Sequence, residues 1–559
     1  MRGLLLPHFA MIDHAPGALE PEPLSSQSAA MPKSGWLAVP LPLAVVVVLS
    51  LLVLAAPAWL FWDDLHHFAL AGDDFTYITN SLDAKTCWSN LLLPHNTHVV
   101  PLFRLWTFAL VAVSGDLARM PLVFGAASYL GLMVVMAVTG HFVSRETGSL
   151  VLGLVVTALV GTTTVLRSTV SWFSAGQALW AGSAIMLTLL AARAWALRGG
   201  LGRLTLIGLG AIGAAAFWSG GLMAAPAAAA YLVVKRPKRG TRMACLFLGL
   251  VTLASGLVVV LSSRNTIAND PVIWERHHGL WPRPIQMVFH SIQATVEKVV
   301  LGGLGLDALT SDWQAVLLLT GLVSVWAWSR GSPRRINPLE ATGAVIVAGS
   351  YLLVYFFRGN MSFDSLRPVD WYNAVPYLGA TLFVAGWWVG LRGEKAAPRG
   401  RLTIAQGLVV LGASGAMLVL HAPRTQRTLF HDAPAMSASE EDLFQGEELL
   451  RYRAVYFKTS HQQRQVRALA RLDKANQFVG GMGVGRTALR GVFGRLDFPG
   501  IPEKQRHTDP FSLLHLPPDD PRAPINPSKV RDELGPFVRP EPEERPPWIK
   551  REEKWPVRR

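Results

Sequence analysis

The chain has 559 residues, of which 51% are hydrophobic and only 16% are charged, and its formal net charge is +14. Soluble domains carry about 25% charged residues, so this composition excludes an ordinary soluble fold and points to a membrane protein. The basic residues fall in short clusters between apolar segments, as membrane topology requires, and this distribution argues against a nucleic-acid-binding surface.

Residues 1–36 are polar and contain Pro and Ser, so we expect a disordered N-terminal segment. The apolar run that follows is too long for the core of a signal peptide and predicts a retained first helix. Later apolar segments also run for about 17 to 25 residues, the length at which a helix crosses a hydrocarbon core. A closed barrel would show short alternating strands instead. The sequence therefore predicts an all-α, polytopic transmembrane domain in residues 37–421.

About eleven spanning helices are expected in this domain, with the N-terminus in the cytoplasm. They cover residues 38–61, 121–143, 149–166, 172–196, 204–217, 220–234, 243–263, 313–329, 340–357, 373–391 and 403–421. With this topology every compact basic cluster falls on the cytoplasmic side, as the positive-inside rule requires. Cys87 and Cys245 then lie on opposite sides of the membrane, so no disulfide framework is expected.

Two interpretations make this topology consistent. The stretch from Leu204 to Val234 is too long for one ordinary span, so we expect a break at Trp218–Gly221 between two short helices. The stretch Val99–Ser114 is short and carries Arg104, so we expect an interfacial helix along the outer surface. Many of the 19 Trp residues lie near segment ends, as in an interfacial aromatic belt.

The last 138 or so residues, 422–559, form a C-terminal tail of different composition. Residues 437–475 predict a helix, because a capping box precedes a loose apolar stripe. From Phe498 the tail is rich in Pro and charged residues and is expected to be largely disordered. An odd number of spans places this tail outside.

The first outer loop, residues 62–120, has two adjacent carboxylates near its start, Asp73 and Asp74. Carboxylates beside a membrane can accept a proton from an acceptor hydroxyl or bind a divalent cation. Alternatively, one of them caps a surface helix that starts at Phe75. His95 and His98 follow in the same loop, where a helical turn would place both on one face, toward a phosphate or a metal.

Polar residues also gather in other outer segments. The turn 167–177 is dense in polar groups for its depth, and the loop 264–312 holds arginines and histidines without recognisable spacing. The last outer loop, residues 358–372, has two arginines at a membrane boundary, Arg358 and Arg367. An Arg at such a position either binds a lipid phosphate or extends from a helix end to the interface. The candidate substrate-binding residues are His95, His98, Arg104, Arg167, Trp172, Gln177, Arg358, Arg367 and Tyr372.

The order of these elements resembles the GT-C superfamily of membrane glycosyltransferases. Its members use polyprenyl-phosphate-linked sugars and include protein O-mannosyltransferases and aminoarabinose transferases. The resemblance rests on a first helix, an outer loop that opens with an acidic pair, then His-x-x-His-x-x-Pro-Leu and an interfacial helix, over roughly residues 38–235. A weaker match follows in Arg367–Pro376, at the entry to a late helix.

This resemblance implies a glycosyl transfer site at the outer, periplasmic face of a bacterial inner membrane. Asp73 would be the catalytic base or a metal ligand, with Asp74 as the acid beside it. His95 and His98 would lie near the donor phosphate, and Arg367 would be its charge partner. The family's second outer turn often carries an Asp, whereas residues 167–177 contain none. Dependence on a divalent cation, Mg²⁺ or Mn²⁺ bound by Asp73 and His95, therefore stays open.

In the implied reaction, Asp73 deprotonates a hydroxyl of a lipid, glycan or protein acceptor, which attacks the anomeric carbon with inversion. Two other classes stay open. A lipid-linked oligosaccharide flippase or transporter would place charged residues around a midplane site, whereas the predicted spans contain almost none. An O-antigen polymerase or ligase would use the loop 264–312, through residues such as His278 and Arg283, and would not need Asp73.

Overall fold

The computed structural model describes residues 39–61, 68, 73–81, 83–95, 98–115, 119–235, 239–263, 283–306, 312–329, 336–357, 370–392 and 402–425. The expected N-terminal segment 1–36, the tail from residue 426 and its predicted helix at 437–475 lie outside these residues. Within them the only β-type pairings are two isolated bridges, Pro40 with Thr403 and His95 with His98. The predicted all-α fold is confirmed for the described chain.

The longer helices form a bundle, and short elements connect them. Helices of 18 residues or more are α1 (Leu43–Leu60), α6 (Met120–Thr147), α9 (Gln177–Arg198), α12 (Arg239–Ser263), α15 (Asp312–Ser329), α16 (Pro338–Phe357), α18 (Ala374–Arg392) and α19 (Ile404–Thr425). Shorter helices are α3 (Asp73–Thr79), α4 (Ala84–Ser89), α5 (Pro101–Ser114), α7 (Leu150–Thr162), α8 (Arg167–Ser171), α10 (Leu201–Phe217), α11 (Ala224–Lys235) and α14 (Arg283–Ala294). Single-turn segments are η2 (Thr164–Leu166), η3 (Phe173–Gly176), η4 (Ser219–Met223), the π-helix η6 (Thr295–Leu301), η7 (Gly302–Leu304) and η8 (Asp370–Asn373).

The described chain has seven helices that are long and apolar enough to cross a membrane, and an eighth span if a bent pair counts as one. The seven are α1, α6, α9, α12, α16, α18 and α19, and the bent pair consists of α7 and the segment Thr164–Ser171, which turn by 51° at their break. A helix is present at each of the eleven predicted positions, but α10, α11 and α15 do not meet the same criterion. A helical membrane fold with several spans is therefore supported, and eleven crossings stays a prediction.

The predicted break between α10 and α11 is present. Helix α10 ends at Phe217, and the single-turn segment η4 separates it from α11. Two glycines make this turn close-packed, because a Cβ at Gly221 would overlap the carbonyl of Ala214 and a Cβ at Gly220 would overlap the Trp218 ring. No larger residue fits at either position without displacing the backbone or the buried indole.

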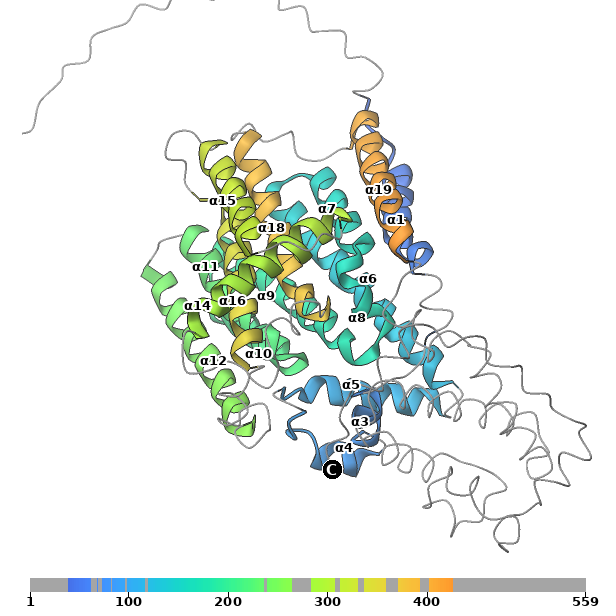
Figure 1. The fold of residues 1–559 in the computed structure, drawn as a ribbon, viewed down its shortest axis with the longest axis vertical. Helices are drawn as coiled ribbons and strands as arrows, with labels where there is room; N and C mark the ends of the chain where they lie inside the picture. The colour runs from blue at the N-terminus through green and yellow to red at the C-terminus, as the bar shows by residue number, and fades with distance from the viewer. Residues whose placement is uncertain are drawn as a thin grey trace, which may run out of the picture.

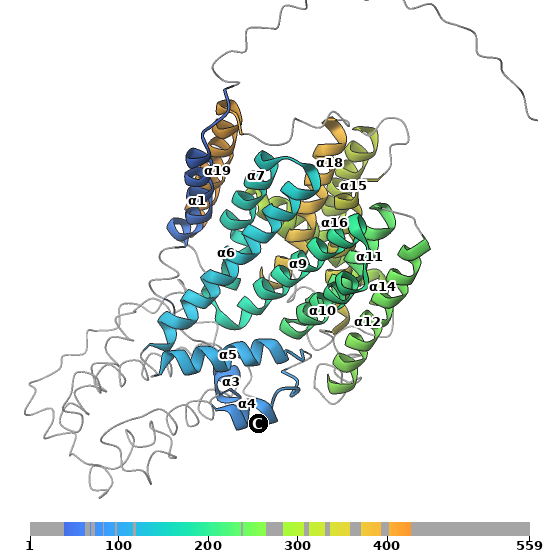
Figure 2. The same cartoon turned by 180° about the vertical axis from the view of Figure 1, so that it is seen from behind.

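Helix α5 lies across one end of the bundle, with α3 and α4 on its other side (Figures 1 and 2). Pro101 occupies its first turn, where a missing N–H costs nothing. Phe103, Thr107 and Leu110 form its buried face, whereas Leu105 and Val113 are exposed. The expected short helix at Val99–Ser114 is thus present and transverse to the bundle, and its place on a membrane surface stays a prediction.

The bundle has two ends that α6 and α9 connect. Helix α6 starts next to η3, where the rings of Phe124 and Phe173 lie 4.4 Å apart, and it ends shortly after Glu146. Helix α9 starts directly after η3 and runs the same way, because Arg193 near its end contacts Glu146. We call these two ends the α5 end and the Glu146 end. All the candidate site residues that the structure describes lie near the α5 end.

Candidate functional site

The two adjacent carboxylates have different environments. Asp74 is fully buried, and its Oδ1 accepts hydrogen bonds from Ser174 N at 2.7 Å and from Ser174 Oγ. The Asp73 side chain is 35% exposed, and its Oδ2 lies 3.0 Å from His95 Nε2. Asp74 therefore attaches the first outer loop to the second outer turn, a hundred residues away, and Asp73 keeps access to solvent.

Both carboxylates also lie in the first turn of α3, where the helix dipole favours negative charge. The alternative interpretation, that one of them only caps a helix, accounts for their place at the start of α3. It does not account for the long-range contacts with Ser174 and His95, because capping groups bond to the first turn of their own helix.

His95 and His98 do not share a helical turn. Their backbones pair with each other instead, with His95 N to His98 O and His98 N to His95 O both at 2.9 Å. The expectation that both side chains lie on one helix face is therefore wrong. His95 faces Asp73 and packs against the Tyr77 ring at 4.9 Å, whereas buried His98 places Nδ1 2.6 Å from Ser219 Oγ.

The pairing of the two histidines has a physical consequence. A short bridged loop points its two side chains at different partners, so one links to α3 and the other to η4. The first outer loop thereby contacts the break between α10 and α11. Sequence spacing did not show this contact, because Ser219 lies 121 residues after His98.

Arg104 on α5 is fully buried against the first outer loop. Its Nη2 donates to Leu93 O at 2.8 Å, and its guanidinium lies 5.6 Å from the centre of the Tyr77 ring. Its carbonyl accepts from Ser81 Oγ and Cys87 Sγ. Burial lowers the pKa of Arg104. Protein encloses the guanidinium, which attaches the loop to α5, and Nε and Nη1 of Arg104 make no hydrogen bond within the described residues. Its role as a substrate-binding residue stays a prediction.

An aromatic row joins the second outer turn to the last outer loop. The rings of Trp172 and Trp371 lie 4.7 Å apart, and Trp371 contacts Tyr372 at 5.6 Å. Tyr372 in turn stacks on Trp218 at 6.3 Å with a 15° angle between the ring planes. Trp218 lies 6.2 Å from the His98 ring. The row brings η8, the second turn and the η4 break to the same end of the bundle.

Two further predicted residues of the second turn are buried. Arg167 is in α8 and Gln177 begins α9, with exposed fractions of 6% and 8%. Gln177 Oε1 has no hydrogen-bond partner. Little of either side chain is accessible in this conformation, and the substrate-binding role of both stays a prediction.

Several predicted residues cannot be placed. Arg358, Arg367 and His278 lie outside the described residues, and α14 begins at Arg283, whose side chain is not described. The expected contact of Arg367 with Asp73 therefore stays a prediction. No group of three or more His, Cys, Asp or Glu within the described ranges lies close enough together to hold a metal ion. The pair of Asp73 and His95 would need at least one more ligand from elsewhere.

Sequence reasoning missed two serines that organise this end. Ser174 binds Asp74 and Ser219 binds His98. Ser174 lies in the turn 167–177, which was predicted to be rich in polar groups, and Ser219 lies in the predicted break at Trp218–Gly221. These two features are the only signal that the sequence carries for them. Their partners depend on how distant segments pack, so spacing along the chain does not reveal them.

No family model, curated protein or solved structure matches this chain. Any functional conclusion therefore depends on the geometry of the α5 end.

Proposed function

We propose that this protein is a membrane glycosyltransferase of the GT-C type, which moves a sugar from a polyprenyl-phosphate donor to an acceptor hydroxyl. One observation carries the proposal: partly exposed Asp73 lies 3.0 Å from His95, directly beside the buried Asp74–Ser174 contact. An accessible carboxylate held by a rigid neighbour is the arrangement that a general base needs.

The proposed reaction is a single displacement. The acceptor oxygen attacks the anomeric carbon, Asp73 takes the hydroxyl proton, and the bond between that carbon and the phosphate oxygen breaks. The polyprenyl phosphate leaves with the electron pair of the broken bond. His95 Nε2 lies beside the Asp73 carboxylate at 3.0 Å, and Asp74 fixes α3 on the second turn.

The second turn of this chain has no acid of its own, in contrast to many GT-C members. Asp74 supplies a carboxylate to that turn from the first loop, because its Oδ1 accepts the N–H and the hydroxyl of Ser174. In the proposal this carboxylate is a positioning group, since it is fully buried and bonded. Arg367 and Arg358 stay the proposed partners of the donor phosphate, and a divalent cation stays an option at Asp73 and His95.

The proposal includes an orientation. Eleven crossings with a cytoplasmic N-terminus would place the α5 end at the periplasmic face of a bacterial inner membrane. The basic residues near the other end support this orientation, because Arg145, Arg193, Arg198 and Lys235 lie in the last turns of α6, α9 and α11 or close to them.

The test compares Asp73→Asn with Asp83→Asn in membranes that contain the full chain. Asp83 lies in the same outer loop and caps α4 through Thr86 N at 2.8 Å, a role that Asn also fills. The assay supplies undecaprenyl-phosphate-linked sugars and follows release of undecaprenyl phosphate. Because Asp73→Asn lacks the general base, its transfer rate should fall by about 10²- to 10⁴-fold, whereas the rate of Asp83→Asn should change little. Full turnover by Asp73→Asn would refute the proposal.

A further inference from the structure

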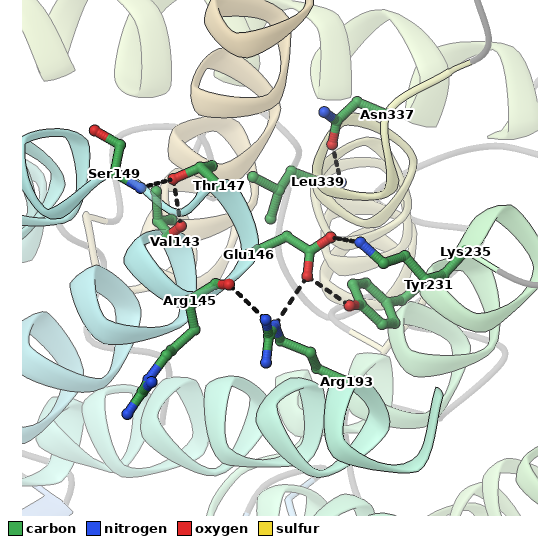
Figure 3. A network of polar contacts seen from close by, with 10 residues as sticks. All are labelled: Val143, Arg145, Glu146, Thr147, Ser149, Arg193, Tyr231, Lys235, Asn337 and Leu339. Carbon is green, nitrogen blue, oxygen red and sulfur yellow. Dashed lines mark hydrogen bonds and ion pairs between the residues drawn. The ribbon is translucent and has the colours of Figure 1, made fainter. Parts of the chain in front are cut away.

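A buried carboxylate joins three helices at the Glu146 end (Figure 3). Glu146, in the last turn of α6, has a side chain that is only 4% exposed. It accepts hydrogen bonds from Arg193 Nε on α9 at 3.2 Å, from Tyr231 Oη on α11 at 2.7 Å and from Lys235 Nζ on α11. Both carboxylate oxygens are therefore engaged, and the two cations are fixed relative to each other.

The basic side chains at this surface outnumber the acids. Arg193 and Lys235 share the single charge of Glu146, and the neighbouring Arg145 adds a third cation. Only the carbonyl of Arg145 takes part in the network, where it accepts from Arg193 Nη2 at 2.6 Å. The exposed Arg145 guanidinium points away from Glu146 (Figure 3), and among the described residues no ion pair or hydrogen bond engages it. Three cations against one carboxylate leave a local excess of two positive charges.

The other acid described near this end is buried and is not part of the accessible surface. Glu340 is 1% exposed, and its carboxylate accepts from Trp326 Nε1 at 3.2 Å and from Asn337 N at 2.8 Å. Arg198, at the last residue of α9, is exposed and adds further positive charge to the same surface. The accessible charge of this surface is therefore basic.

The basic surface is remote from Asp73 and lies at a membrane boundary. Arg193 comes 16 residues after Gln177 on α9, which is about 24 Å of helix away from the second turn. It also lies where two apolar stretches of spanning length end, Leu122–Thr147 and Phe173–Arg198. Lipid headgroups occupy this depth beside a membrane helix.

We propose that Arg145, Arg193 and Lys235 form a binding site for the headgroup of an anionic phospholipid. The phosphodiester oxygens accept hydrogen bonds from the exposed Arg145 guanidinium, and Arg193 and Lys235 add positive charge to the same surface. Glu146 holds the two cations in place without cancelling the charge of all three. A phosphatidylcholine headgroup fits less well, because its own cation is repelled by the surplus positive charge.

The proposal is tested by native mass spectrometry of the full chain in detergent, titrated with phosphatidylglycerol and, separately, with phosphatidylcholine. Arg145→Gln and the double variant Arg145→Gln/Arg198→Gln remove charge without breaking a protein contact of the guanidinium groups. The control is Arg119→Gln, an exposed cation just before the start of α6, about 39 Å from Arg145 along the helix. Each lost charge is expected to weaken phosphatidylglycerol binding about fivefold, with Arg119→Gln unchanged.

Two results would overturn the proposal. One is equal affinity of the wild type for both lipids, and the other is a loss of binding in Arg119→Gln as large as that in Arg145→Gln. An unchanged melting temperature in the variants confirms that the fold is intact. Asp73→Asn is expected to bind phosphatidylglycerol like the wild type, so this proposal and the proposed transferase activity fail or stand separately.

Discussion

The two ends of the bundle each hold a carboxylate with a basic neighbour, but the surroundings differ. Asp73 at the α5 end is 35% exposed, and its Oδ2 lies 3.0 Å from Nε2 of His95. Glu146 at the other end is 4% exposed and engages two cations and a phenol. A fully bonded, buried carboxylate stabilises packing, whereas an accessible one beside an imidazole is available to exchange a proton.

The hydrogen-bond networks at the two ends also connect different parts of the chain. The Glu146 network links the ends of three helices of the bundle, α6, α9 and α11. The contacts at the α5 end link loops and single turns, namely α3 with η3 and the His95–His98 bridge with η4. Functional side chains are commonly carried by such loops on a rigid scaffold, and the proposed site at the α5 end has this arrangement.

The largest expected effect is the difference between two substitutions, each of which replaces one of these carboxylates by its amide. Asp73→Asn should abolish most transfer, whereas Glu146→Gln should keep the rate per folded molecule. Glu146→Gln should instead lower the free energy of unfolding by about 2 kcal/mol, because two cations lose their counter-charge. This value is reduced from the cost of breaking a fully buried pair, since Arg193 and Lys235 are 27% and 33% exposed.

Unfolding in mixed micelles, together with transfer normalised to folded protein, measures this contrast. A Glu146→Gln variant of normal stability but without transfer would contradict the division of roles. It would place chemistry at the end of the bundle where only packing and lipid binding are inferred.

A second prediction concerns the docking of the first outer loop on α5. Cys87 in α4 is 2% exposed, and its thiol donates to Arg104 O. Burial raises the pKa of this thiol, so at neutral pH it holds less of the reactive thiolate than an exposed cysteine. In a Cys245→Ser background we expect maleimide labelling about a hundredfold slower in native membranes than in denaturant, increasing as the pH rises.

Because the pKa of the Cys87 thiol is raised, the thiol stays protonated to higher pH in the folded protein. The labelling rate therefore increases only at the higher pH values at which thiolate forms. Equal labelling rates in native and denatured samples would contradict the packed loop. The arrangement of Asp73 and His95 would then lose its support, since both belong to the same loop.

The sequence predicted the helical elements better than the contacts between them. Apolar length predicted a helix at eleven positions that are helical in the structure, and the break at Trp218–Gly221 was predicted because Leu204–Val234 is too long for one ordinary span. The helical turn expected for His95 and His98 was wrong, because backbone pairing between the two residues replaced it. Local spacing does not encode pairing that depends on Ser219, which belongs to another part of the chain.

The candidate carboxylates were found from the sequence, but their different environments were not. Adjacent Asp residues look equivalent in a sequence, and only the position of Ser174 makes one buried and the other accessible. Glu146 was not singled out, because one acid in the last turn of a helix is an ordinary feature. Its three partners come from α9 and α11, 47 to 89 residues later.

The smallest expected effect tests how the α5 end is held together. Ser174→Ala removes the hydroxyl that donates to Asp74 and leaves the backbone N–H in place at 2.7 Å. The loss of one hydrogen bond to a buried carboxylate should lower the free energy of unfolding by about 1 to 2 kcal/mol. Ser174→Thr, which keeps a hydroxyl, is the matched control, and both are measured by unfolding and by transfer.

Because Asp74 positions Asp73 and does not itself take the proton, Ser174→Ala should lower transfer by about tenfold or less and leave its pH profile unchanged. A loss as large as that of Asp73→Asn would mean that the Asp74 carboxylate takes part in the chemistry. The division between an accessible base and a buried anchor within one acidic pair would then be wrong, although the contrast with Glu146 would remain.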